Sequence, residues 1–555
     1  MGGKPEAINR APIHLVAPAP RSQVLLCRHR GRRGRQSVSQ STPMVAMTQT
    51  HSETENIRIA RILALFVVIA SGTLLAQGEP SIVVTWEKKT LNRTVPTLQA
   101  VVNPMLRRGS PIHDSSFDAL HSLGADYVRY AFWMPYPKLA VAELRPPDAS
   151  QTYWDFQYMD PLVEDFLRAS AGHSSVMSFS TIPQWMFTTP QPIAYPDDPN
   201  QVIWNYSQGT QLPDVKALGD YYARLASWYT HGGFTDELGK FHSSPYHYDI
   251  RYWEVFNEVD GEHDMTPQQY VERYDAVTQA VLKVAPAMKF VGLALSSPSE
   301  APKTFAYFLD PKNHQPGVPL DYISFHGYAT PSGDETLDDW QYTFFDQASE
   351  FVSVTRYILQ IRDLLSPSTK IMVDEAGSIL NGDMSQGEPG HMEKSIPPAY
   401  WNLSGALYAY LYIELAKLGV DTVGESQLVG YPSQFPSVTM IDWTNGKPNA
   451  RFTVLELIKN NFGPGDELPV TEVKSNGSFA ESDAIDAQAF TREGKRKLLL
   501  INKRNREVTV VVPKECLGAT IQTIGGAAPD AVAQNVGEAK VRLKPFAVSV
   551  VALKD

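Results

Sequence analysis

Two short strand-like stretches, each ending in a glutamate, decide the fold of this chain. The first is YWEVFNE, residues 252–258, and the second is KIMVDE, residues 370–375. A turn-like break follows each stretch, VDG after the first and AGS after the second. Short apolar runs that are closed by turn residues are typical of β-strands. The sequence therefore predicts two strands that present a carboxylate, Glu258 or Glu375, at their carboxyl ends.

Strand-like and helix-like segments alternate along the chain from about residue 98. Glu258, Gly292, Phe325 and Glu375 fall on successive strand-like runs, and they are 34, 33 and 50 residues apart. This spacing accommodates a strand, a helix and two connections. No glycine-rich phosphate loop follows the first strand, which disfavours a doubly wound sheet. The alternation predicts an α/β fold, a (β/α)8 TIM barrel over residues 98–462 with its chemistry at the carboxyl ends of the strands.

The elements of this barrel can be placed from the hydrophobic pattern and the turn signals. The strands are expected at 98–103, 126–133, 175–180, 252–258, 289–294, 322–326, 370–375 and 420–424. The main helices are expected at 115–123, 159–171, 215–232, 266–284, 345–365 and 398–418.

Beyond residue 462 the pattern changes to short β-rich runs such as KLLLIN at 497–502, and no long helical period remains. This texture predicts a C-terminal antiparallel β-sandwich over residues 463–555. The segment 78–97 holds a further strand, SIVVTW at 81–86, ahead of the barrel. Because nothing else is available to cover it, this strand is expected to pair into the sandwich.

The formal charge of −11 is unevenly distributed along the 555 residues. Residues 1–46 hold eight basic side chains and one acidic side chain, Glu6, so the rest of the chain carries −18. An acidic body argues against nucleic acid and against an anionic membrane as partners. The basic leader 1–46 is interpreted as disordered or as a mis-assigned start, with Met44 or Met47 as the true initiator.

A signal-like segment follows this leader. Arg58 and Arg61 precede the apolar run 62–70, and small residues follow it. A basic start, a short apolar run and small residues describe a secretory signal. Residues 47–77 are therefore expected to be a signal peptide, which predicts a secreted or periplasmic protein. The alternative is a membrane anchor with an extracytoplasmic catalytic domain and a basic cytoplasmic tail.

The chain holds only two cysteines, Cys27 and Cys516, and the first lies in the basic leader. The body of the protein is therefore expected to form no internal disulfide. No cluster of cysteine and histidine has the spacing of a zinc site. Neither a metal nor an organic cofactor is expected.

Paired carboxylates at one end of a barrel suit the hydrolysis of glycosidic bonds, in which two acids flank the scissile bond. Asn257 precedes Glu258, and its amide could bind a sugar hydroxyl without adding charge. A structural alternative for Glu258 is an ion pair with a surface cation. Asp374 is an alternative to Glu375, because alternation along a strand sends only one of two neighbours into the barrel.

The Asn257-Glu258 pair on strand four and Glu375 on strand seven resemble the retaining glycoside hydrolases of clan A. With the trailing β-sandwich, the chain is most similar to family 39, the β-xylosidase and α-L-iduronidase group. Two features depart from that family. Residues 257–260 read NEVD where family 39 usually has NEPD, and the common tryptophan of strand eight is not evident in GESQ at 424–427. These departures leave the identity of the sugar open.

The resemblance implies a role for each matching residue. Glu258 would be the general acid/base, Glu375 the nucleophile and Asn257 a ligand of the hydroxyl next to the reacting carbon. Arg129 on strand two would orient the nucleophile and keep it ionised, and its structural alternative is an ordinary ion pair. His326 and Tyr328 match the histidine and aromatic positions of strand six, and the alternative for His326 is a hydrogen-bonded core histidine.

Flat side chains could form further contacts with a sugar. Trp133, Trp185 and Trp401 are candidate platforms, because an aromatic face packs against the C–H face of a pyranose; core packing is the alternative for each. His263 lies in the loop after Glu258 and could contact substrate.

The predicted function is a retaining glycoside hydrolase that cleaves oligo- or polysaccharides of plants or microbes by double displacement. A carbohydrate is the expected partner, and no membrane partner is expected beyond an N-terminal anchor. Two alternatives stay open: a non-catalytic carbohydrate-binding barrel, and a transglycosylase that uses the same carboxylates.

Overall fold

The structure is a computed structural model that describes residues 78–188, 194–207, 210–211, 214–333, 335–381, 383, 396–431, 435–475, 483–526 and 528–554. The basic leader, the signal-like segment and Cys27 lie outside the described residues. Within the described part of the chain, every helix is too short or too polar to cross a membrane.

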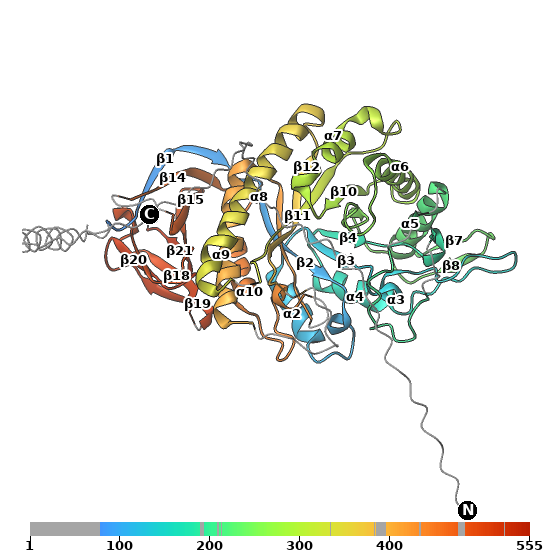
Figure 1. Ribbon diagram of the computed structural model, residues 1–555, viewed down its shortest axis with the longest axis horizontal. Coiled ribbons are helices and arrows are strands. Elements are labelled where there is room, and N and C mark those ends of the chain that lie inside the picture. The colour runs from blue at the N-terminus through green and yellow to red at the C-terminus, as the bar shows by residue number, and fades with distance from the viewer. Residues whose placement is uncertain are drawn as a thin grey trace, which may run out of the picture. The chain divides into compact units, whose positions relative to one another are not determined.

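Eight parallel strands close into a barrel, as the alternating pattern predicts (Figure 1). Their order in space follows their order in the chain, and the last strand pairs with the first through Thr422 and Val95. The strands are β2 (Val95–Val101), β3 (Val128–Phe132), β4 (Ser175–Phe179), β9 (Tyr252–Val255), β10 (Lys289–Leu295), β11 (Tyr322–Ala329), β12 (Lys370–Ser378) and β13 (Thr422–Ser426). The TIM-barrel prediction is confirmed.

Helices follow the barrel strands and cover them. They are α2 (His113–Leu123), α3 (Pro137–Ala140), α4 (Met159–Ala169), α5 (Val215–Thr230), α6 (Pro267–Val284), α7 (Pro302–Leu309), α8 (Leu337–Leu365), α9 (Pro398–Leu418) and α10 (Ala450–Asn461). Local sequence fixes the start of α6, because Thr266 and Gln269 form a capping box around Pro267. The sequence pattern misses α3, α7 and α10, and it starts α8 eight residues late.

Outside the barrel, the short strands of the described residues form one nine-stranded sheet and two small hairpins. The order in the large sheet is β19-β18-β21-β16-β15-β14-β1-β17-β20. Its strands are β1 (Ser81–Leu91), β14 (Glu467–Lys474), β15 (Ile485–Arg492), β16 (Lys495–Asn502), β17 (Val508–Val511), β18 (Thr520–Gly525), β19 (Ala528–Asn535), β20 (Lys540–Leu543) and β21 (Val548–Ala552). The hairpins are β5 (Phe187–Thr188) with β6 (Thr210–Gln211), and β7 (Gly233–Thr235) with β8 (Phe241–Ser243). In the large sheet β1 pairs antiparallel with β14, from Ser81 opposite Lys474 to Leu91 opposite Glu467.

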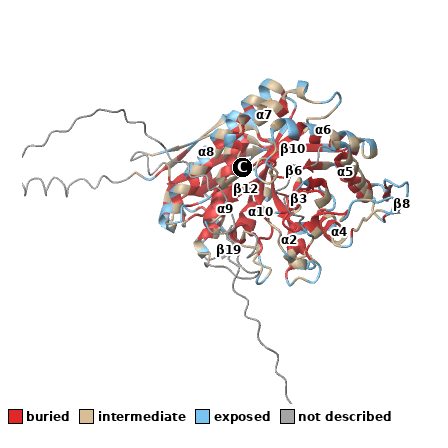
Figure 2. Cartoon of the chain, turned by 45° about the vertical axis from the view of Figure 1, so that its right-hand side comes forward, coloured by how far each residue is buried: buried red, intermediate tan, exposed pale blue. Residues whose placement is uncertain are grey.

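Strand β16 shows why this sheet packs on two sides. Leu499 and Ile501 belong to the core that also fills the barrel, whereas Leu498 and Leu500 belong to a second core inside the sandwich. Successive side chains of a strand point to opposite faces, so one apolar run serves both cores. Helix α9 contacts β12 of the barrel and β16 of the sandwich, and most of its residues are buried (Figure 2). The barrel and the sandwich therefore share a continuous apolar core.

A buried ion pair fixes the end of the barrel wall between β12 and β13. Arg451 on α10 donates from Nε to Oε1 of Glu425 at 3.0 Å, and both side chains are fully buried. Its Nη1 also donates to the Ser437 carbonyl at 2.8 Å. Gly377 makes this approach feasible, because a Cβ there would lie 2.8 Å from Nη2 of Arg451. The guanidinium thus holds together strand ends that lead into the loops above the barrel.

Burial raises the pKa of Glu425 to about 8 although the charge of Arg451 opposes this. We expect Arg451→Met to lower the free energy of unfolding by about 3–5 kcal/mol, because it leaves the buried Glu425 carboxyl group without its cation and hydrogen-bond donor. Urea denaturation followed by circular dichroism measures this change. The double variant Arg451→Met/Glu425→Met removes both charges and should recover much of the loss. A single variant as stable as the wild type would contradict the role of the pair.

Candidate active site

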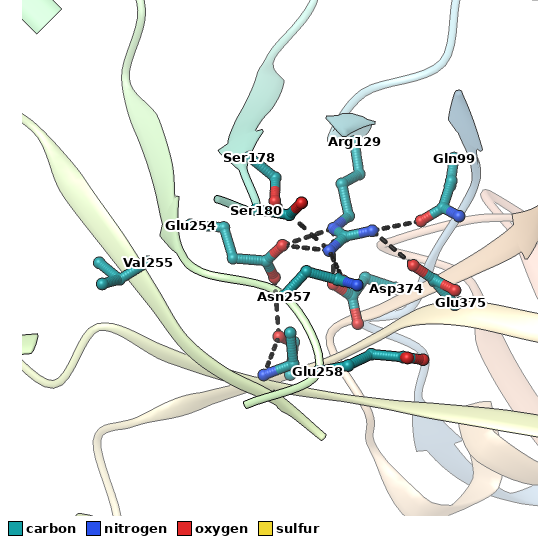
Figure 3. Close-up of polar contacts among 12 residues, drawn as sticks. Gln99, Arg129, Ser178, Ser180, Glu254, Val255, Asn257, Glu258, Asp374 and Glu375 are labelled. Atoms are coloured by element: carbon teal, nitrogen blue, oxygen red, sulfur yellow. Dashed lines mark hydrogen bonds and ion pairs between the residues drawn. The ribbon is translucent and has the colours of Figure 1, made fainter. Parts of the chain in front are cut away.

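The guanidinium of Arg129 lies at the centre of a polar network inside the barrel (Figure 3). It extends from β3 and is 1% exposed. Its Nη1 donates to Oε1 of Glu375 at 2.6 Å and its Nη2 to Oδ1 of Asn257 at 2.5 Å. Further bonds reach Glu254 and Gln99. Burial lowers the pKa of Arg129, but the surrounding carboxylates raise it more strongly, so the guanidinium stays charged.

A bulge in β12 turns two successive carboxyl groups toward this cation. Phe325 of β11 is opposite Val373, but the next residue, His326, is opposite Glu375, so β12 holds one extra residue. Glu375 and Asp374 consequently both contact Arg129, the second through Nε at 3.1 Å. Alternation along the strand predicts that only one of them enters the barrel, and this prediction is wrong. Only Glu375 lines the cavity described below.

Glu375 lies within β12, which continues through residues 376–378, so it does not end its strand as predicted. Glu258 lies in the turn after β9 rather than at the end of that strand. The strand ends at Val255, and Phe256 and Glu258 have positive φ angles of 66° and 41°. Such backbone is costly for residues other than glycine, by about 1–3 kcal/mol each, and it is concentrated at functional sites. The Glu258 amide donates to the Ala294 carbonyl at 2.9 Å, which fixes the turn.

Strand β11 supplies two side chains that contact the carboxylates. His326 lies between them, with Nδ1 2.9 Å from Oε1 of Glu258 and 3.5 Å from Oε2 of Glu375. The Tyr328 hydroxyl donates to Oε2 of Glu375 at 2.7 Å. His326 therefore contacts both acids, and Tyr328 contacts Glu375.

The surroundings shift the pKa values of the two acids in opposite directions. Burial raises the pKa of Glu258, and the negative charge of Glu375 adds to this, although the bond from His326 opposes it. Burial also acts to raise the pKa of Glu375, but the charges of His326 and Arg129 outweigh it and lower that pKa. One carboxyl group is thus favoured as an acid and the other as an anion.

His326 itself behaves as a buried cation. Burial alone would lower its pKa, but the charge of Glu375 and the hydrogen bond to Glu258 raise it to about 10. One ligand atom from each of these three residues lies within 4.8 Å of the others, a donor set that could hold a metal ion. A histidine that binds a metal must be neutral. Without a metal ion, the imidazolium carries the positive charge between the two carboxylates.

A cavity of about 180 Å³ opens onto both carboxylates. Its walls combine polar groups with apolar side chains. The lining residues are Gln99, Val101, Ala131, Trp133, Asn257, Glu258, Tyr328, Glu375, Ile379, Gln427, Phe435 and Val438. Trp133 packs edge-to-face against Trp204, with ring centroids 5.2 Å apart.

Three predicted sugar contacts lie away from this cavity. Trp185 lines a separate hollow next to Met186, and its indole donates to the Glu143 carbonyl at 3.3 Å. Trp401 is on α9 and packs against Tyr400. His263 donates from Nε2 to the Ser180 carbonyl at 2.8 Å. Burial lowers the pKa of His263 to about 4, so its ring is a neutral core group.

Sequence reasoning misses several groups of this site. Glu254 on β9 is fully buried and contacts Arg129 at 2.5 Å. Alternation along the stretch 252–258 places it on the same side as Glu258, and this signal could have identified it. Glu262, Gln427 and Phe435 lie in loops, where no periodicity marks them.

Two family models match parts of the chain. The model described as glycosyl hydrolases family 39 matches residues 239–376, a segment that contains Glu258, His326 and Glu375. The model described as the C-terminal immunoglobulin-like domain of D-apionate lactonase matches residues 482–551, in the sandwich. No curated protein matches the chain.

Solved structures share the fold at low sequence identity. A GH51 arabinofuranosidase from Xanthomonas axonopodis pv. citri has a TM-score of 0.57 and 15% identity, over 86% of this chain and all of that chain. An α-L-arabinofuranosidase from Thermotoga maritima has a TM-score of 0.54 and 15% identity, over 85% and 99%. The catalytic domain of GH30 xylanase C from Talaromyces cellulolyticus has a TM-score of 0.52 and 11% identity, over 86% and 100%.

The barrel, the carboxylate site and these similarities define a glycosidase with the architecture of clan A. Within that class, residues 239–376 are similar to glycosyl hydrolases family 39. The family resemblance of the sequence is thereby supported.

The charged state of His326 gives a testable dependence of stability on pH. Its pKa of about 10 in the folded protein exceeds the usual value of 6.5. Its stabilising contribution is therefore complete below about pH 6.5 and is lost as the pH rises toward 10. We expect the difference in unfolding free energy between wild type and His326→Gln to shrink over this range, as measured by urea denaturation.

Replacing the exposed His231 by glutamine is the matched control and should leave the pH dependence unchanged. A difference for His326→Gln that stays flat or grows from pH 6.5 to 10 would show that the histidine is not a buried cation. NMR spectra of isotope-labelled histidine report the same protonation directly.

Proposed function

We propose that the protein is a retaining glycoside hydrolase in which Glu375 is the nucleophile and Glu258 the general acid/base. The observation that carries this proposal is the convergence of the two acids on one cavity. A carboxylate oxygen of each lies within 4.8 Å of the other. Retaining enzymes hold their carboxyl groups roughly 5–5.5 Å apart, whereas inverting enzymes need about 6.5–9.5 Å to admit a water. The observed spacing favours retention.

In the first step the Glu375 carboxylate attacks the anomeric carbon while Glu258 donates its proton to the leaving oxygen. Arg129 and His326 support the anionic form of Glu375, and burial supports the protonated form of Glu258. The product of this step is a glycosyl ester on Glu375 with the original leaving group released as an alcohol.

The second step reverses the role of Glu258. Ester formation removes the negative charge of Glu375, which is one of the causes of the raised pKa of Glu258. The Glu258 carboxylate can then accept a proton from water, and the resulting hydroxide displaces the sugar from Glu375. Two inversions leave the anomeric configuration unchanged.

The site is more complete than a sugar-binding barrel requires. Binding alone needs neither an acid with a raised pKa nor a carboxylate held ionised between two cations. Perturbed pKa values at a cavity favour catalysis. This observation favours an enzyme over a non-catalytic barrel protein.

We expect Glu258→Ala to lower kcat for aryl glycosides with poor leaving groups by about 10²–10⁴-fold, as is typical for loss of an acid/base. Glu375→Ala should be inactive without added azide. Azide should rescue Glu375→Ala to give an inverted glycosyl azide and Glu258→Ala to give a retained one, which NMR of the products distinguishes. The exposed Glu472→Ala is the control.

Normal turnover by Glu375→Ala would refute the assignment of the nucleophile. If the product first released by the wild type had the opposite anomeric configuration to the substrate, the double-displacement mechanism would be refuted. Both acids could still be essential in that case.

The substrate we propose is a neutral sugar, and specifically a pentoside. Among the described residues that line the cavity, none is a lysine or an arginine. A uronate carboxylate would therefore meet Glu258 and Glu375 without a free cation. A cavity of about 180 Å³ is also smaller than the roughly 300–1,000 Å³ of sites for drug-sized ligands. The similar structures named as arabinofuranosidases and as a xylanase add support for a pentose.

A panel of 4-nitrophenyl glycosides tests this proposal. We expect kcat/KM for the better of the β-xylopyranoside and the α-L-arabinofuranoside to exceed that for the β-glucuronide by at least about 100-fold, because an unpaired buried carboxylate is strongly rejected. Preference for the glucuronide would overturn the neutral-sugar proposal and leave the roles of the carboxylates untouched.

We also propose that the protein acts outside the cytoplasm, on oligo- or polysaccharides of plants or microbes. The signal-like pattern at 47–77 supports this location. Polymeric substrates do not cross membranes freely, so an exported enzyme fits the proposed chemistry.

A further inference from the structure

Glu262 is a buried acid that the proposed reaction does not use. It lies four residues after Glu258, in the turn that leads into α6, and its side chain is 5% exposed. One oxygen, Oε1, accepts hydrogen bonds from Nδ2 of Asn257 at 2.8 Å and from the indole Nε1 of Trp133. These two donors come from the ends of different strands, β9 and β3. A single carboxyl oxygen thus joins two parts of the cavity wall.

The backbone around Glu262 is fixed to the acid/base. The Glu262 amide donates to the Glu258 carbonyl at 2.7 Å. In the same turn, Asp260 accepts hydrogen bonds from the amides of Ser296 and Ser297, both at 2.9 Å. The turn therefore has little freedom, and Oε1 of Glu262 has a defined position relative to Glu258.

The two groups that Glu262 holds face the cavity in different ways. Asn257 presents a polar amide, and its Oδ1 is already occupied by Arg129 at 2.5 Å. Trp133 presents an aromatic surface, which packs against Trp204 and Phe435 on its other sides. Without Glu262 the indole N–H and the Asn257 amide would each lose an acceptor in a buried setting.

We propose that Glu262 is a positioning residue that fixes Asn257 and Trp133 as one sugar-binding unit. The proposal rests on the glycosidase function above and deepens it. Asn257 contacts a hydroxyl of the sugar bound at the cavity, and Trp133 contacts its apolar face. Glu262 touches neither the sugar nor the reacting atoms, and it acts by holding both groups in register with Glu258.

The proposal requires an acceptor at Oε1 and no negative charge. Burial and the charge of Glu258 raise the pKa of Glu262 well above its usual value, which favours the neutral acid. Oε2 has no hydrogen-bond partner among the described residues, and Nε2 of His263 lies 4.0 Å away. A glutamine places a carbonyl oxygen at the same position as Oε1, so it should perform the same task.

Kinetics of the full-length Glu262→Ala and Glu262→Gln variants test the proposal on the best aryl glycoside. We expect Glu262→Ala to lower kcat/KM by about 10–100-fold, mainly through KM, because two buried hydrogen bonds are lost. Glu262→Gln should rescue most of this loss and keep the acidic and basic limbs of the pH–rate profile in place. Glu472→Ala, on the exposed face of β14, is the matched control for loss of a glutamate.

A second comparison separates positioning from general stability. On the 2-deoxy form of the substrate, which lacks the hydroxyl assigned to Asn257, the effect of Glu262→Ala should shrink at least several-fold. Trp133→Phe keeps an aromatic ring and removes only the indole N–H, so it should reproduce part of the rise in KM. This variant also serves if Glu262→Ala does not fold.

Several outcomes would overturn the proposal. Glu262→Gln as impaired as Glu262→Ala would mean that a negative charge, and not an acceptor, is required. Unchanged kinetics in Glu262→Ala or in Trp133→Phe would show that the bridge from Glu262 to Asn257 and Trp133 does not support sugar binding. If Glu262→Ala lowered kcat/KM equally on the 2-deoxy substrate, Glu262 would not act through Asn257. None of these results alters azide rescue of Glu375→Ala, so failure of the proposed function is recognised separately.

Discussion

The site depends on one buried guanidinium that contacts several buried acids inside the barrel. Arg129 extends from β3 and bonds to Gln99 on β2, Ser178 on β4, Glu254 on β9 and Glu375 on β12. Arginine suits this place because its donors form a fixed fan and it does not lose its proton. A smaller or neutral residue would leave several carboxylates in apolar surroundings, where at least some of them would have to protonate. The same guanidinium therefore connects the strands and supplies the positive charge that the carboxylates need.

The difference between the two central acids follows from where the cations lie. Glu375 contacts both Arg129 and His326, whereas His326 is the one cation that Glu258 contacts among the described residues. Both carboxyl groups pay the same kind of desolvation cost, but only Glu375 has enough positive charge nearby to offset it. The bulge in β12 is part of this arrangement, because it brings Glu375 next to Arg129 without removing Asp374 from the network. The pKa values of two chemically identical side chains thereby shift in opposite directions.

The barrel could be predicted from the sequence because its strand-like and helix-like segments recur at regular spacing. Eight apolar runs at βα spacing identify the strands, although β12 continues past Glu375 to Ser378. Local backbone conformation leaves no periodic pattern in the sequence. The positive φ of Glu258 and the bulge beside Asp374 depend on contacts across the barrel. Composition was a weaker guide, since Trp185 and Trp401 are aromatic in the same way as Trp133 but lie away from the cavity. Loop residues of the cavity wall have no sequence signal of their own.

The pairing of β1 with β14 has a consequence for how the chain is made. Ser81 and Lys474 are neighbours in the sheet but 393 residues apart in the chain. At about 5–20 residues per second, β1 leaves the ribosome roughly 20–80 s before its partner exists. During that time its polar edge has no native strand to pair with. The sandwich can close only after the whole barrel has been synthesised. Strand β1, which precedes the barrel, is therefore among the last strands to form its native pairing.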